Sequence, residues 1–222
     1  VLHQDSSAPI VAVKAVVGVG SIYEKDYLGS GISHYLEHLV AGGSTSKHTE
    51  DYYKTELSQL GGVSNAYTTT DHTAYFINTT PQQIDTAIRI LYEWLFFNTL
   101  EQHEVDREKE VITREIEKNN VSIPRLFYYL SQRNTYTKHP ARLPVIGYLD
   151  QFNQLTKKDL MKFYKENYTA SNMTLIIGGN FELKNTKKLI ESLFGTQQQV
   201  AKPSYDDINE PMPFNDRQKT ET

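Results

Sequence analysis

Cysteine is absent from the 222-residue sequence. Disulfide bridges and thiolate ligands are therefore excluded, and any bound metal ion must rely on histidine and carboxylate side chains. Long apolar runs are missing as well. The longest, such as residues 11–19, are far shorter than the roughly 20 residues that a helix needs to cross a bilayer. We expect a globular chain without a transmembrane segment.

An excess of basic charge is also lacking. The sequence has 23 Lys and Arg against 27 Asp and Glu, a net charge of −4. These residues are scattered rather than clustered, so nothing resembles the basic field that captures nucleic-acid phosphates, and nucleic acid is not an expected partner. The first residue is Val1, and no signal peptide precedes the first strand-like segment. We interpret the N-terminus as trimmed.

Periodic apolar residues predict strands mixed with helices but no regular alternation of the two, which favours an α+β fold around a mixed, largely antiparallel sheet. Residues 1–195 are expected to form one domain, and the polar residues 196–222 a linker. The expected strands are residues 10–19, one bent or two separate strands within 63–78, and 173–178. The expected helices are residues 32–40, 49–60, 81–97, 101–119, one starting near 124, 153–168 and 186–194.

Two histidines are spaced for joint metal binding. His34 and His38 are four residues apart, so on a helix their imidazoles project from the same face, one turn apart. Glu37 lies beside them and is placed to take a proton from a water that a metal ion activates. The order H-x-x-E-H is that of the inverted zinc-peptidase motif, and amide hydrolysis is the reaction that it implies.

A catalytic zinc ion normally has a third protein ligand and one open position. The acidic helix expected at residues 101–119 offers Glu108 and Glu115, which lie two turns apart on roughly the same face. Either carboxylate can approach the histidine pair, and spacing alone leaves the choice open.

The surrounding sequence resembles the family of pitrilysin, insulin-degrading enzyme and the mitochondrial processing peptidases. The resemblance spans residues 10–181, nearly the whole chain. It rests on several ordered segments: 31–38 (GISHYLEH), 60–68 (LGGVSNAYT), 71–75 (DHTAY), 107–116 (REKEVITREI), 139–140 (HP), 144–147 (PVIG) and 167–173 (NYTASNM).

The resemblance implies a zinc endopeptidase with one Zn²⁺ per chain, acting on extended peptides or small unfolded proteins. It selects Glu115 as the third ligand and makes Glu108 a second acidic residue of the site, beside the catalytic Glu37. It also makes Asn65, Ala66 and Tyr67 part of an exposed edge strand that pairs with substrate backbone. A second homologous domain or subunit is the implied partner, and the bacterial cytoplasm or periplasm the favoured location, with an organelle as the alternative.

Two features keep other interpretations open. The family includes partner subunits that keep the fold without the chemistry, so a non-catalytic scaffold is the alternative function. The family also commonly has a bulky aromatic and a basic residue shortly after the second histidine, where this chain has Val40, Ala41 and two glycines. This difference leaves the predicted ligands intact but alters the adjoining pocket.

Overall fold

A five-stranded sheet forms the centre of the computed structural model, which describes residues 1–198, 200–205 and 209–212. The strand order is β1-β5-β2-β4-β3. β1 runs parallel to β5, and the other neighbouring pairs are antiparallel. The predicted α+β class with a mixed, largely antiparallel sheet is therefore confirmed. The strands are β1 Leu2–Gln4, β2 Val11–Val17, β3 Val63–Thr68, β4 Thr73–Thr79 and β5 Met173–Gly179.

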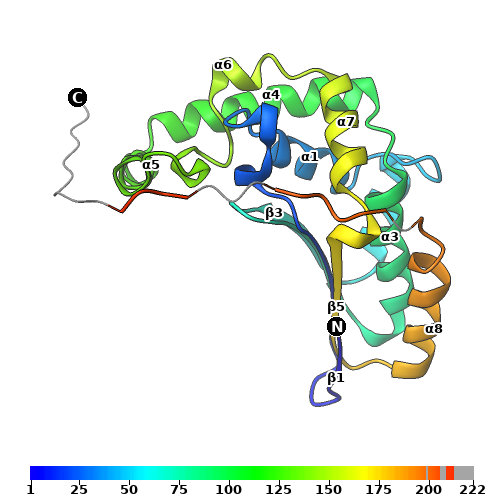
Figure 1. Ribbon diagram of the computed structural model, residues 1–222. Coiled ribbons are helices and arrows are strands. Elements are labelled where there is room, and N and C mark those ends of the chain that lie inside the picture. The colour runs from blue at the N-terminus through cyan, green and yellow to red at the C-terminus, as the bar shows by residue number, and fades with distance from the viewer. Residues whose placement is uncertain (199, 206–208, 213–222) are drawn as a thin grey trace.

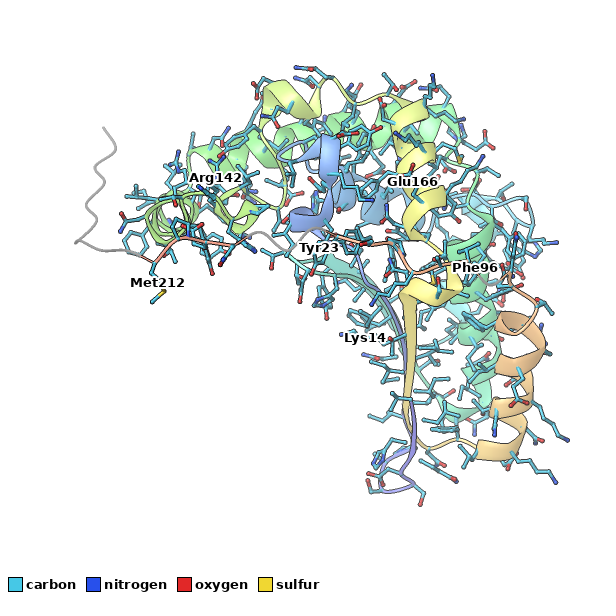
Figure 2. The ribbon with its side chains drawn as sticks, viewed as in Figure 1. Lys14, Tyr23, Phe96, Arg142, Glu166 and Met212 are labelled. Atoms are coloured by element: carbon cyan, nitrogen blue, oxygen red, sulfur yellow. The ribbon has the colours of Figure 1, made fainter. Side chains whose placement is uncertain are left out.

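The larger helices gather on one side of this curved sheet (Figure 1). Figure 2 shows Lys14 of β2 on the opposite side, away from the helices. Among the described residues, no helix combines the length and the apolar character that a membrane span requires. The α-helices are α1 Ile32–Val40, α2 Glu50–Gln59, α3 Ile84–Phe97, α4 Gln102–Asn120, α5 Ile123–Thr135, α6 Leu149–Phe152, α7 Lys157–Asn167 and α8 Leu183–Phe194.

The core lies between the sheet and these helices. In β2 every second side chain points toward the helices, as the pleat of a strand requires. Val11, Val13, Ala15 and Val17 are accordingly buried, whereas Ala12 between them is exposed. The other buried apolar residues of this core come mainly from α1, α3 and α7, so α1 lies inside the molecule.

The elements differ from those predicted at several places, including the short helix α6, which the expected helices do not contain. β1 is not among the expected strands, because its three residues carry no alternation and are ordered by pairing with β5. The expected helix 153–168 begins only at Lys157, where Thr156 and Asp159 form a capping box. α8 starts before residue 186, since the Glu182 carboxylate accepts hydrogen bonds from two backbone amides of its first turn.

Part of the predicted linker contacts the body of the molecule. The Tyr205 ring stacks on Tyr23 with ring centres 4.0 Å apart, and its hydroxyl donates to the carbonyl of Gly18. The Glu210 carboxylate accepts hydrogen bonds from the backbone amides of residues 137–139. The described parts of this segment thus run across the molecule toward α5 (Figure 1). Residues 199, 206–208 and 213–222 of the predicted linker lie outside the described part.

Candidate metal centre

Helix α1 carries the H-x-x-E-H motif, and its first turn is fixed by close backbone packing. Gly31, just before the helix, has φ 73° in the left-handed region. A Cβ atom at this position would collide with the carbonyl of Ile146. Glycine is therefore needed for the loop at residues 144–147 to lie against the helix. The carboxylate of the buried residue Glu24 accepts a hydrogen bond of 3.0 Å from the backbone amide of Ser33.

The rest of α1 is held by neighbouring helices. The buried Tyr35 hydroxyl donates a 2.6 Å hydrogen bond to the carbonyl of Val105 in α4. At the far end, the Asn98 amide donates to the carbonyl of Leu39 over 3.1 Å. Both bonds are buried, so they fix α1 relative to α4 and to the end of α3.

Three side chains converge between α1 and α4. The Nε2 atoms of His34 and His38 each lie 3.8 Å from the same carboxylate oxygen of Glu115. One ligand atom from each residue falls within 4.8 Å of the others. Nitrogen and carboxylate ligands bind zinc at about 2.0–2.2 Å. Atoms spaced in this way can therefore surround one small cation, and the donor set of two imidazoles and a carboxylate fits zinc.

Glu108 approaches the same histidine pair from another side. Its carboxylate lies 3.1 Å from Nδ1 of His38, the nitrogen opposite the one that faces Glu115. Arg107 holds this carboxylate through a 3.0 Å bond and also binds both oxygens of Glu50. A proton on His38 Nδ1 donated to Glu108 leaves Nε2 free to bind a metal. The geometry thus separates the two acidic residues that spacing left equivalent.

Glu37 faces the edge strand. Its carboxylate accepts a 2.8 Å hydrogen bond from the hydroxyl of Thr68, the last residue of β3. The side chain is partly buried, and this burial raises the pKa of Glu37 while the Thr68 bond acts in the opposite direction. A single hydrogen bond therefore links the candidate base to the strand predicted to bind substrate.

The protonation of the two histidines differs. Burial and the neighbouring His38 lower the pKa of His34 to about 3, so its imidazole is neutral at pH 7. Burial also acts to lower the pKa of His38, but the bond to Glu108 and the nearby carboxylates outweigh it, and the pKa is raised. The His38 bond in turn lowers the pKa of Glu108. These pKa shifts are those expected if His34 is a neutral metal ligand and if a carboxylate orients the ring of His38.

Two cavities flank the converging residues. One of about 360 Å³ adjoins His34 and Glu115 and extends along the turn after β3 to α5. The other, of about 350 Å³, adjoins Glu37 and His38 and reaches the earlier part of β3. Ala41 and Gly42 line this second cavity, so the altered residues after the motif do shape a pocket beside the site.

The predicted substrate-binding residues lie on β3, which is an outer strand of the sheet. Asn65 and Ala66 line the cavity beside Glu37. Tyr67 differs: its hydroxyl accepts a hydrogen bond from Nζ of Lys14 on the uncovered face, and the Lys14 ammonium lies 4.7 Å from its ring centre. Its side chain thus points away from Glu37, and only its backbone shares the strand edge.

The sequence assigns no individual role to three further residues near the site: Thr68, Arg107 and Arg125. Thr68 and Arg107 act through contacts distant in sequence, to Glu37 and to Glu50. Arg125 lines the cavity beside His34. Thr68 and Arg107 fall inside two of the segments that carry the family resemblance, and membership in these segments is the sequence feature that could have identified them. Arg125 falls outside them.

Comparison with known proteins identifies related sequences and structures. Residues 1–162 match the family described as Insulinase (Peptidase family M16), and residues 154–221 match the Peptidase M16 inactive domain. An uncharacterized zinc protease of Rickettsia felis is 29% identical over 195 residues, covering 88% of this chain and 47% of that protein. Subunit 1 of the mitochondrial cytochrome b-c1 complex of Bos taurus is 26% identical over 208 residues, covering 92% and 43%.

A solved structure shares the fold. The crystal structure of a protease from Helicobacter pylori matches with a TM-score of 0.85 and 25% sequence identity, over 95% of this chain and 51% of that one. The chain therefore spans about half the length of these proteins. Of the two sequence relatives, one is named as a protease and the other as a subunit of a complex.

Proposed function

Because the chain belongs to the insulinase family of peptidases, family M16, we propose that it is the metal-binding half of a zinc-dependent endopeptidase. Its substrates are peptides or small unfolded proteins held in extended form. One observation carries the proposal: two histidine nitrogens and a Glu115 oxygen converge within 4.8 Å, next to a shielded second carboxylate, Glu37.

His34, His38 and Glu115 are the proposed ligands of one zinc ion per chain. When bound, zinc supplies Lewis-acid activation of water and of the peptide carbonyl. Glu108 has a positioning role, because it bonds the rear nitrogen of His38 and thereby orients the ring.

Glu37 is the proposed general base and accepts a proton from the attacking water at its carboxylate. The Thr68 hydroxyl donates to one of its oxygens and so fixes the direction of the carboxylate. The later transfer of this proton to the leaving amine uses the same carboxylate, now acting as an acid.

Substrate is proposed to bind as an additional strand along β3. An outer strand presents unpaired backbone groups, which recognise an extended peptide with little dependence on its side chains. The Thr68 bond brings the end of this strand next to Glu37. A peptide paired with residues 65–67 would therefore pass beside the base.

The alternative function is a non-catalytic scaffold of the same fold. It is favoured by one observation, the similarity to a cytochrome b-c1 complex subunit. A scaffold has no need of converging metal ligands beside a shielded carboxylate, whereas a peptidase requires both. Metal content and peptide turnover separate the two functions.

The decisive experiment compares the natural full-length protein with its Glu37→Gln variant. We expect one zinc per chain in both proteins, and turnover of a quenched extended peptide only in the first. The amide keeps the size of the side chain but lacks the oxygen that accepts a proton. Zinc is measured by elemental analysis on the same preparation.

Glu110→Gln serves as the matched control, because this carboxylate lies on the exposed surface of α4, 78% accessible. It should leave zinc and turnover unchanged. Near-normal turnover in Glu37→Gln would remove Glu37 from the role of base, and a protein without zinc or turnover would favour the scaffold.

A further inference from the structure

The cavity beside His34 has a positive charge that the chemistry proposed above does not use. Besides His34 and Glu115, it is lined by Arg125 of α5 and by uncharged side chains. Resting on the proposed peptidase function, we infer that this cavity is a specificity pocket for an acidic substrate side chain, and that Arg125 is the residue that selects it.

The Arg125 guanidinium is available for a ligand. Arg125 is exposed, and no carboxylate of the described residues forms an ion pair with it. Among the described residues that line this cavity, Glu115 alone carries a carboxylate, and Glu115 faces the two histidines at 3.8 Å. An arginine binds a carboxylate through two parallel hydrogen bonds, which favours Asp or Glu over neutral residues.

The remaining walls suit a single polar side chain. Tyr128 and Tyr129 of α5 stand beside Arg125, and Asn119 of α4 and Thr70 add donors. The guanidinium influences its surroundings here, since its charge acts to lower the pKa of Tyr129 against the effect of burial. A volume of about 360 Å³ holds one such side chain with room for water.

The position of the cavity determines which substrate residue enters it. It adjoins residues 68–70, at the end of β3, whereas the other cavity adjoins residues 64–66. A peptide that pairs antiparallel with β3, as β4 already does, runs from the Thr68 end toward the Val63 end. Residues N-terminal to the scissile bond therefore reach Arg125, and the acidic preference belongs to that side.

The test uses extended peptides that differ at one position, with Glu, Gln or Lys placed in turn on each side of the scissile bond. Turnover is measured with the full-length protein. Peptide binding is measured by fluorescence anisotropy with the Glu37→Gln protein, so that selectivity is read without turnover. We expect Glu to exceed Gln by roughly 3- to 10-fold at one N-terminal position, and the ratio to shrink at high salt.

Arg125→Gln should bring this ratio to about one, and Arg125→Glu should reverse it in favour of Lys. Arg114→Glu is the matched control: this arginine is exposed on α4, where it pairs with Glu110, and should leave the ratio intact. If peptides are cleaved with no acidic preference, or if Arg125→Glu leaves the preference unchanged, the pocket assignment is wrong while the peptidase function stands.

A preference on the C-terminal side also overturns the assignment as stated. If no peptide is cleaved, yet the Glu37→Gln protein binds acidic peptides through Arg125, the pocket is supported and the peptidase function fails. Absence of both cleavage and selective binding contradicts both proposals.

Discussion

Two carboxylates of α4 lie beside different atoms of the histidine pair, and this difference supports the different roles proposed for them. Glu115 lies 3.8 Å from both Nε2 atoms, whereas Glu108 lies 3.1 Å from Nδ1 of His38. Glu108 is also bonded to Arg107, so its charge is already matched. Glu115 has no such partner among the described residues apart from the two histidines, and its position is suited to a cation.

We therefore predict that Glu115→Ala abolishes stoichiometric zinc binding, whereas Glu108→Ala weakens it by roughly 10- to 100-fold, the usual effect of losing a group that orients a ligand. A competition titration against a chromophoric chelator measures both affinities. Glu110→Ala, on the exposed side of α4, is the control. If Glu108→Ala empties the site and Glu115→Ala does not, the assignment is reversed.

At the scale of single residues, the sequence predicts the contacts of the site wherever the partners are close together in the chain. The pairing of His34 with His38 follows from a four-residue spacing on one helix. The choice between Glu108 and Glu115 could not follow from spacing, because it depends on how α4 crosses α1. The bond from Thr68 to Glu37 spans 31 residues, and the interaction of Arg107 with Glu50 spans 57. Such contacts arise from packing and have no local pattern.

Helix α1 is held at its start by a carboxyl group in an unfavourable place. Glu24 is completely buried, and burial raises its pKa to about 8 although several backbone hydrogen bonds act to lower it. One of its oxygens has no hydrogen-bond partner among the described residues. The side chain is therefore mostly protonated at neutral pH in the folded state. Burying this carboxyl group is unfavourable, but its hydrogen bond to the backbone amide of Ser33 fixes the start of the helix that carries the candidate ligands.

This arrangement predicts a pH-dependent stability. In the unfolded chain Glu24 ionises near its ordinary pKa of 4.5, whereas in the folded protein it keeps its proton to about pH 8. The contribution of Glu24 to the free energy of unfolding is thus constant below pH 4.5 and falls as pH rises from 4.5 to 8. Each pH unit in this window is worth up to about 1.4 kcal/mol, so the total loss is a few kcal/mol.

Glu24→Gln should remove this loss, since the amide cannot ionise. Urea unfolding of both proteins at a series of pH values gives the difference between them, in which the titration of the groups they share cancels. We expect the variant to gain relative stability steadily between pH 4.5 and 8. A constant difference over this range would show that Glu24 ionises normally in the folded protein.

Element boundaries were predictable where caps or periodicity are strong. The strand expected at residues 10–19 and the helix expected at residues 32–40 follow from apolar patterns, and the structure has them at Val11–Val17 and Ile32–Val40. β1 could not be predicted, because three residues beside β5 have no periodicity. The start of α7 was recognisable in principle from Thr156 and Asp159, yet the apolar Leu155 extended the apparent helix across it.

At the scale of the whole molecule, the strand beside the candidate site lies at an edge of the sheet. β3 is an outer strand, and the opposite face of the sheet presents Lys14 on the side away from the helices (Figure 2). The chain also spans about half the length of the relatives described above. We propose that residues 1–195 form the metal-binding domain, and that a second homologous domain or subunit completes the chamber around it.

Adding the second homologous domain or subunit, here called the second half, should therefore change peptide turnover but not metal binding. The proposed ligands all come from α1 and α4 of this chain, so the isolated 222 residues should bind zinc. A peptide laid along β3 would be open to water on its other side and would lose both orientation and shielding. We predict slow cleavage by the isolated chain and a strong increase when the second half is added in trans.

Titration of the isolated chain with the second half, followed by the turnover of a quenched peptide, measures this effect. Zinc stoichiometry recorded at each step should stay at one per chain. The Glu37→Gln chain with the same second half is the control, because any activity of the added half would appear there. An isolated chain that already matches the activity of the natural full-length protein would show that this domain alone suffices for catalysis.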